Sequence, residues 1–326
     1  MAVLTAITEE DARTLLAAYG LGPFRALEGI AAGSVNSNFA LQSSERRVFL
    51  RIYEERDLAG ARAETAMLER LASRGVPTPA PLRRTDGALV SVVRGKPAAV
   101  FPWRSGGMRC QAAVTPADAR RVGEALARVH VAGRDEACDA GRFRFEDLLA
   151  RVDRIDASAD PRFTPLVAPL RERLEQARAA RDPRLPRGLT HGDLFRDNVL
   201  WDDRGDITAL LDFESACEGT YVYDLMVTVL AWCVGDALDP RLAAAMCAGY
   251  EGVRPLSPAE RRGALAEALF AALRFTVTRI TDYALRTSDA GPRVVKDWRR
   301  FDARYHALSS LGPAGLLGAL GLDHGS

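Results

Sequence analysis

The sequence feature that most constrains the fold is a polar segment followed by two short apolar runs. Residues 191–198 (HGDLFRDN) precede an apolar run at 199–201, turn-forming residues at 202–206, and a second apolar run at 207–211. Two apolar runs separated by Asp, Arg and Gly residues are typical of a β-hairpin. Because hairpin strands are antiparallel, the start of the first strand lies beside the end of the second.

This pairing predicts where three polar side chains lie. Asn198 and Asp212 emerge at the same open end of the hairpin, and Asp193 comes just before that end. Two carboxylates and an amide on one rim suit a hard cation with oxygen ligands, and one carboxylate is left to take a proton. The alternative is an Asp-rich turn whose side chains cap local backbone groups. The spacing, the hairpin and the flanking apolar runs together favour the chemical interpretation.

Alternation of apolar and polar residues predicts strands in the first part of the chain. It is clearest at 47–53, where Leu50 and Ile52 share one face and Arg51 lies on the other. Further strand-like runs begin at about residue 24 and occupy 88–93 and 98–101.

Helical periodicity dominates the second part of the chain. The predicted helices are 8–19, 60–74, 117–132, 143–155, 164–180, 222–234, 239–250, 258–286 and 295–310. A linker with Pro and Gly residues is expected near 101–107. We therefore predict an α+β protein with a small β-rich N-terminal lobe, residues 1–103, and a larger, mainly helical C-terminal lobe, residues 104–326, that contains the hairpin.

Composition restricts the partners and the location. The formal net charge is +1 and there is no basic run, so the chain has no electrostatic footprint for nucleic acid. No apolar run approaches transmembrane length, and no basic-then-apolar leader opens the sequence. The 5 cysteines are scattered, which favours reduced thiols. We expect a soluble cytoplasmic protein that acts on a small molecule and binds neither nucleic acid nor membrane; the sequence leaves its oligomeric state open.

The polar segment also carries a family resemblance. His191-Gly192-Asp193, with Asn198 five positions after the Asp and Asp212 beyond the hairpin, resembles the motif of the aminoglycoside phosphotransferase/choline kinase superfamily. That superfamily has a protein-kinase-like, two-lobe fold. Flanking segments look like bacterial homoserine kinases built on that fold: 29–39, 194–200, 223–225, 232–233, 274–275 and 279.

The resemblance implies a phosphotransferase that uses ATP and Mg²⁺. Asp193 matches the catalytic residue that accepts or orients the proton of the substrate hydroxyl. Asn198 and Asp212 match the residues that bind the Mg²⁺ ion bridging the ATP phosphates. His191 would be structural, and Asp224 would be a structural anchor rather than a catalyst.

The same resemblance places nucleotide contacts in the first part of the chain. Residues that match the phosphate-covering loop are Gly33, Ser34, Asn36 and Asn38. Small residues let backbone N–H groups approach phosphate, although an ordinary hairpin turn would have a similar composition. Phe101 and Trp103 fall where the hinge would meet adenine, and the alternative is an aromatic-bearing linker.

Arg51 and Glu64 occupy the positions where kinases usually pair a strand Lys with a helix Glu. Here the cation is Arg, whose reach and hydrogen-bonding geometry differ from those of an ammonium group. The resemblance implies that Arg51 contacts the ATP phosphates with Glu64 as its partner. The alternative is a surface strand residue and a solvated helix residue.

By the same resemblance, the acceptor is L-homoserine, phosphorylated on its side-chain oxygen in threonine biosynthesis. An amino-acid acceptor needs a cation for its carboxylate and an acidic group for its ammonium. Arg274 and Arg279, and Glu214 and Glu218, have the required chemistry.

Two alternatives stay open. The first is another acceptor on the same fold, such as an aminoglycoside, an amino alcohol or another small hydroxyl compound. The second is a nucleotide-binding regulator without turnover, which the Arg at position 51 suggests. A Walker A loop is excluded, because Gly95-Lys96 is followed by Pro97 and lacks the upstream glycine.

Overall fold

The computed structural model describes residues 4–30, 35–285 and 296–323. The chain divides into two compact units, Met1–Gly107 with Thr208–Leu211 and Met108–Ile207 with Asp212–Ser326. The first contains an antiparallel sheet and the second is mainly helical, so the predicted α+β class is confirmed. Within the described ranges, no helix has both the length and the hydropathy needed to cross a bilayer.

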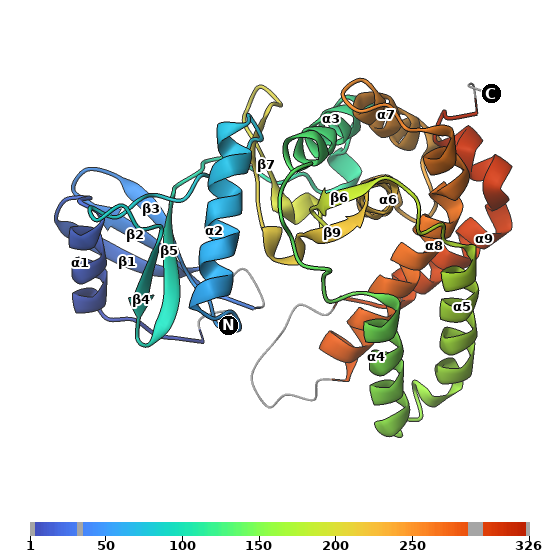
Figure 1. The fold of residues 1–326 in the computed structure, drawn as a ribbon, viewed down its shortest axis with the longest axis horizontal. Coiled ribbons are helices and arrows are strands. Elements are labelled where there is room, and N and C mark those ends of the chain that lie inside the picture. Colours follow the sequence, from blue (N-terminus) through green and yellow to red (C-terminus); the bar gives the residue numbers. More distant parts are fainter. Residues whose placement is uncertain (1–3, 31–34, 286–295, 324–326) are drawn as a thin grey trace. The chain divides into compact units, whose positions relative to one another are not determined.

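A five-stranded antiparallel sheet forms the first unit, with strand order β1-β2-β3-β5-β4 (Figure 1). The alternation predicted at 47–53 is confirmed, because Leu50 and Ile52 are buried on one face of the sheet. The strands are β1 (Phe24–Ile30), β2 (Ser37–Ser43), β3 (Arg47–Ile52), β4 (Val90–Val93) and β5 (Lys96–Pro102).

Two helices cover opposite faces of this sheet. Helix α1 (Glu9–Ala18) begins at the predicted cap Thr8 and packs its apolar residues against Leu50 and its neighbours. Helix α2 (Leu58–Ser73) lies on the other face, because Arg51 points away from Leu50 and contacts Glu64 of α2. The alternating pattern of β3 therefore presents apolar residues to one helix and a cation to the other.

Seven helices that the sequence predicts form most of the described part of the second unit. Their bounds lie within a few residues of the predicted ones, except at the ends of the last two helices. The helix predicted over 258–286 is α-helical only to Arg279. They are α3 (Pro116–Ala132), α4 (Phe145–Ala157), α5 (Val167–Ala180), α6 (Tyr221–Trp232), α7 (Pro240–Glu251), α8 (Pro258–Arg279) and α9 (Arg299–Ala319). Helix α8 contacts α4, α5, α6 and α9, and α3 packs against α7 (Figure 1).

Two short sheets position the polar segment. The predicted hairpin is confirmed, since β7 (Val199–Trp201) pairs with β8 (Ile207–Leu210). A second pair, β6 (Arg187–Thr190) with β9 (Cys217–Thr220), was not predicted, and its register aligns Thr190 with Cys217. The chain after β6 and the chain before β9 are therefore brought side by side, and these segments carry Asp193 and Asp212.

Candidate active site

The segment after β6 makes a tight turn that begins at Gly192. Gly192 has φ 73°, in the left-handed region that favours glycine. The backbone N–H of Asp193 donates to Nδ1 of His191 at 3.3 Å, and the N–H of Phe195 donates to the carbonyl of Asp193 at 2.7 Å. One 3₁₀ turn, Arg196–Asn198, then leads into β7. This local bonding determines where the Asp193 side chain lies.

Asp193 is partly buried, with 25% of its side chain exposed. Burial raises the pKa of its carboxyl above the usual range, and the charge of Asp212 adds to this, while Arg274 and Lys296 act to lower it. The Oδ1 atom of Asp193 lies 3.5 Å from Nη1 of Arg274. A carboxylate whose pKa is raised is a better proton acceptor than an ordinary Asp.

Asn198 and Asp212 both present a side-chain oxygen. The Nδ2 group of Asn198 donates to the carbonyl of Asp193 at 2.8 Å, so its Oδ1 is the atom left for a ligand. Asp212 has φ 61° and ψ 65°, a left-handed conformation that is uncommon outside glycine. Its buried Oδ1 has no hydrogen-bond partner among the described residues. A buried carboxylate oxygen without a donor suits a cation.

Asp224 of α6 accepts hydrogen bonds from the backbone of this turn. It accepts hydrogen bonds from the backbone N–H groups of His191 (2.6 Å) and Gly192 (2.8 Å), and from Nε2 of His130 (2.9 Å). Burial acts to raise the pKa of Asp224, but the hydrogen bond and charge of His130 outweigh it, so the pKa is lowered. This geometry agrees with the expected anchor role of Asp224. His130 was not singled out in the sequence, where it is one residue on the apolar face of a helix.

His191 is buried with its ring against Phe213, at a centroid distance of 4.5 Å. Phe213 directly follows Asp212, so the imidazole packs between the two acidic segments. Its Nδ1 accepts the N–H of Asp193. These contacts support the expected structural role of His191, which stays a prediction.

Gly192 gives a prediction that separates two effects. A Cβ built there would lie 2.8 Å from the carbonyl oxygen of Ser215, so Gly192→Ala adds a backbone clash to the strain of positive φ. We expect a loss of unfolding free energy of about 3 kcal/mol or more, together with loss of turnover. Urea unfolding measures the first and steady-state kinetics the second.

Gly205→Ala is the matched control for this prediction. Gly205 lies in the hairpin turn with φ 81°, but its nearest atoms would be flexible Arg side chains at 3.6 Å and 3.7 Å. Gly205→Ala should lower the unfolding free energy by only about 1–2 kcal/mol, because it adds backbone strain alone. Equal losses of unfolding free energy in the two variants would show that the contact with the Ser215 carbonyl does not destabilise Gly192→Ala.

The predicted phosphate loop is described only in part. Gly33 and Ser34 lie outside the described residues. Asn36 is buried and its Oδ1 accepts the backbone N–H of Glu54 at 3.1 Å. Asn38 is buried in β2, directly opposite Arg51 of β3 in the register. Of the four predicted residues, Asn38 thus lies beside Arg51, and Asn36 is bonded to the chain just after β3.

The predicted ion pair on the sheet is present. Nη1 of Arg51 lies 3.4 Å from Oε1 of Glu64, which also accepts from the Tyr53 hydroxyl at 3.1 Å. Arg56 contacts the second oxygen, Oε2, at 3.0 Å. Glu64 is buried rather than solvated. Arg51 is therefore held by a helix Glu, in the arrangement expected for a strand Lys.

Phe101 and Trp103 lie at the end of β5. Phe101 is buried within that strand, with its ring 6.2 Å from that of Phe49. Trp103 follows the strand and is covered by the guanidinium of Arg47 at 3.8 Å. Both side chains thus pack against neighbouring residues of the sheet, and their position at a hinge and their contact with adenine stay predictions.

The two candidate acids for an ammonium group differ in their surroundings. Glu214 belongs to the 3₁₀ turn Phe213–Ser215, two residues after Asp212. Glu218 is exposed on β9 and pairs with Arg187 at 2.8 Å. Glu218 is therefore engaged at the surface, whereas Glu214 follows the candidate metal ligand Asp212 closely in the chain.

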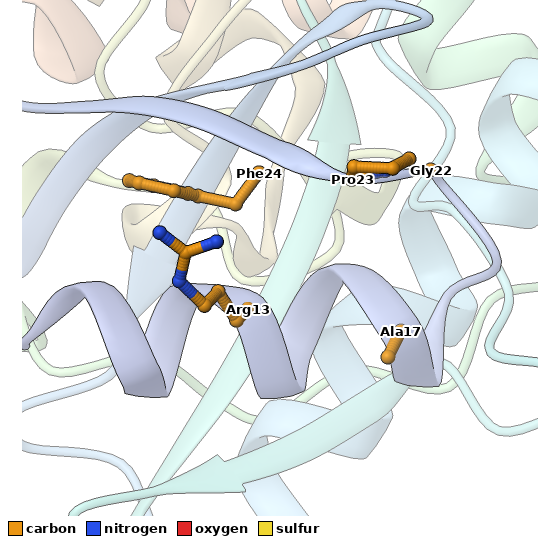
Figure 2. Close-up of a pocket in the computed structure, with 5 residues that line it drawn as sticks. All are labelled: Arg13, Ala17, Gly22, Pro23 and Phe24. Atoms are coloured by element: carbon orange, nitrogen blue, oxygen red, sulfur yellow. The ribbon is translucent and has the colours of Figure 1, made fainter.

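A surface pocket in the first unit lies elsewhere. It is lined by Arg13, Ala17, Gly22, Pro23 and Phe24, between α1 and the start of β1 (Figure 2). Figure 2 shows the guanidinium of Arg13 beside the ring of Phe24, and the distance to the ring centroid is 4.7 Å. Arg13 also pairs with Glu9 at 3.3 Å. This pocket shares no residue with the predicted nucleotide site.

Comparison with known sequences extends these observations. A family model described as "Phosphotransferase enzyme family" matches residues 26–259. The homoserine kinase of Caulobacter vibrioides is 36% identical over 294 residues, covering 87% of this chain and 90% of the relative. The homoserine kinase of Methylocella silvestris is 37% identical over 328 residues, covering 98% of this chain and 100% of the relative.

Solved structures share the architecture. An amicoumacin kinase matches with a TM-score of 0.69 at 14% identity, covering 94% of this chain and 93% of that one. A choline kinase from Streptococcus pneumoniae matches with a TM-score of 0.63 at 14% identity, covering 93% and 99%. At this identity the likeness concerns the fold alone, and it confirms the predicted protein-kinase-like fold.

Proposed function

The chain belongs to the phosphotransferase enzyme family, and we propose that it is an ATP-dependent kinase of L-homoserine. The observation that carries the proposal is the assembly of Asp193, Asn198 and Asp212 around the turn after β6. The acceptor follows from relatives 36% and 37% identical over 87% and 98% of the chain, which are homoserine kinases.

Asn198 and Asp212 are the residues that would hold Mg²⁺. When bound, the ion neutralises charge on the ATP phosphates. Their free side-chain oxygens fit an ion that takes one or two protein ligands and completes its shell with phosphate and water.

Asp193 performs the proton transfer in this proposal. The side-chain hydroxyl of homoserine attacks the γ-phosphorus of ATP, its proton passes to the Asp193 carboxylate, and ADP leaves. Asn198 supports the step by holding the Asp193 carbonyl, and Arg274 supports it by holding the carbonyl of Gly192 at 2.9 Å. Preorganisation of the proton acceptor, Asp193, is the main contribution of this rigid turn.

The proposal is tested by measuring ADP release with a panel of acceptors. L-homoserine is compared with an aminoglycoside, choline and 3-amino-1-propanol, at equal concentrations and with Mg²⁺. We expect turnover to be highest with homoserine. ATP binding without product from any acceptor would identify a nucleotide-binding regulator instead. We expect the reaction to occur in the cytoplasm, where ATP is available.

Arg51 gives a prediction for the nucleotide side of the reaction. A guanidinium that contacts phosphate makes a charge-assisted hydrogen bond, so Arg51→Met should raise the KM for ATP about 10–100-fold. Arg51→Lys should recover part of the loss. The control is Arg25→Met, since Arg25 is an exposed residue of β1. A KM for ATP within twofold of wild type in Arg51→Met would remove Arg51 from the nucleotide site.

A further inference from the structure

We propose that Arg279, at the end of α8, binds the carboxylate of the acceptor, and that Arg274 supports it from the same helix. The site would then select hydroxy amino acids over amino alcohols and polycationic sugars. This inference deepens the proposed function and depends on it. In this proposal the acceptor carboxylate binds the guanidinium group of Arg279, while Asp193 receives the hydroxyl proton.

Three aromatic rings connect the catalytic turn to α8 and α9. Phe195, two residues after Asp193, lies 5.0 Å from Phe275 and 6.2 Å from Phe301, between ring centroids. Phe275 and Phe301 are 4.7 Å apart. These rings form a rigid apolar base beside the catalytic residue.

Both arginines stack on this base. The guanidinium carbon of Arg274 lies 3.9 Å from the centroid of Phe275, and that of Arg279 lies 4.4 Å from the centroid of Phe301. Stacking stabilises the cation but does not neutralise it. It leaves the N–H groups at the edge of the guanidinium plane for a planar, bidentate partner such as a carboxylate.

Arg279 has no carboxylate partner among the described residues, whereas Arg274 has one, Asp193, at 3.5 Å. Arg279 makes no salt bridge in the part of the chain that the structure describes, and it donates one hydrogen bond, to the carbonyl of Asp297 at 2.9 Å. Arg274 is only 3% exposed, and its Nε has no hydrogen-bond partner among the described residues. A buried donor without a partner is costly unless a ligand supplies one.

The charge of Asp193 influences the pKa of Arg279. Burial lowers the pKa of Arg279 to about 10, while the charges of Tyr283 and Asp193 act to raise it. The field at Asp193 is in turn shaped by Arg274 and Lys296. The acceptor site is therefore cationic on this side, and a polycationic sugar would be repelled there.

Arg304 adds a further positive charge near Arg279, which favours binding of an anion there. Arg304 also lies against Phe301, at 4.4 Å, and its pKa is lowered to about 9 by burial and by the charges of Arg279, Arg300 and Arg196. None of these four arginines forms a salt bridge within the described ranges. A bound carboxylate would reduce this mutual repulsion.

Helix geometry changes at the same point. Immediately after Arg279, α8 continues as a π-helical turn, Ile280–Ala284. Such turns are rare and occur frequently at functional sites, because they alter the direction of successive side chains. Arg279 keeps helical dihedrals, φ −67° and ψ −32°, and is the last residue before this change.

The test compares two acceptors that differ only in the carboxylate. L-homoserine and 3-amino-1-propanol share the hydroxyl and the amine, and 4-hydroxybutyrate keeps the carboxylate without the amine. We expect wild type to prefer homoserine over aminopropanol by about 100-fold or more in kcat/KM. Arg279→Gln should lower kcat/KM for homoserine about 100-fold, mainly through KM, and change that for aminopropanol less than threefold.

Arg279→Lys and Arg178→Gln complete the design. Arg279→Lys keeps the positive charge but loses the bidentate hydrogen-bonding geometry of the guanidinium group. It should recover part of the affinity for homoserine and 4-hydroxybutyrate. Arg178 is an exposed arginine of α5 that also stacks on a phenylalanine, at 4.5 Å. Its replacement should leave kcat/KM unchanged for both acceptors. Urea unfolding of each variant separates loss of binding from loss of fold.

The outcomes distinguish this inference from the proposed function. Equal use of homoserine and aminopropanol by wild type would overturn the carboxylate site and leave the kinase intact. An equal loss for both acceptors in folded Arg279→Gln and Arg279→Lys would also overturn it. If wild type phosphorylates no acceptor, the proposed function itself fails, and this inference fails with it.

Discussion

Replacing Asp193 by Asn is expected to lower kcat by about 10²–10⁴-fold. The amide cannot accept the hydroxyl proton, but it has nearly the same shape and can keep the 3.5 Å approach of Arg274. Affinity for ATP should stay within about threefold, because the nucleotide is held by other groups. Steady-state ADP release measures the first quantity and calorimetric titration with a non-hydrolysable ATP analogue the second.

Asp197→Asn is the matched control for this loss. Asp197 lies on the same turn but is exposed, and it should keep turnover within a factor of about two. A folded Asp193→Asn enzyme with more than a tenth of wild-type kcat would show that another group takes the proton. A loss of ATP affinity equal to the loss of kcat would instead assign Asp193 to nucleotide binding.

Asp224→Ala should destabilise the second unit by about 3–5 kcal/mol, which is a large part of the stability of an ordinary domain. The change leaves three buried donors without an acceptor: the N–H groups of His191 and Gly192, and Nε2 of His130. Turnover should fall as well, because the turn that carries Asp193 loses its anchor. Urea unfolding followed by tryptophan fluorescence measures the stability.

The pH dependence of this contribution follows from the lowered pKa of Asp224. The stabilisation is present above the pKa that Asp224 has in the unfolded chain, and it is lost as the pH falls through the lower folded-state value. The difference in stability between wild type and Asp224→Ala should therefore shrink in acid. A difference that stays constant down to acidic pH would contradict the proposed charge state.

Asp156→Ala provides the control for the stability loss. Asp156 pairs with Arg171 at 3.5 Å on the surface of α4, where 55% of its side chain is exposed. An exposed pair of this kind contributes about 0–1 kcal/mol. If Asp224→Ala costs no more than this, the anchor does not hold the turn.

The parts of the fold that could be predicted depend on local patterns. The alternation at 47–53, the Thr8 cap and the hairpin after Asn198 each depend on residues close together in the sequence, and all are present. Helix α9 continues to Ala319 through Gly312 and Pro313, a pair that breaks regular helical geometry and therefore hides the second half of the helix from a periodicity argument.

Pairings between distant segments could not be predicted in this way. Strands β6 and β9 have four residues each and are joined by a long connection, so neither has enough alternation to be recognised. His130 was missed because its partners, Asp224 and Tyr250, come from two other helices. The stacking of Arg274 and Arg279 on Phe275 and Phe301 likewise requires the packing of α8 on α9, which no local pattern reports.

The candidate site was predictable where one short motif carries it. Asp193, Asn198 and Asp212 lie near one hairpin, so hairpin geometry was enough to bring them together. The pairing of Arg51 with Glu64 was expected only through family resemblance, because a strand and a helix approach each other in ways that spacing does not determine. The roles of all these residues are predictions that the experiments above address.

Phosphorus NMR of the product tests the central claim most directly. Wild-type protein is incubated with ATP, Mg²⁺ and L-homoserine, and the ³¹P spectrum is followed over time. We predict that ADP and a phosphomonoester coupled to one CH₂ group appear together in equal amounts, and that Asp193→Asn produces neither at a comparable rate. Formation of inorganic phosphate alone, or an unchanged ATP spectrum with active-site residues intact, would contradict phosphoryl transfer to the homoserine hydroxyl.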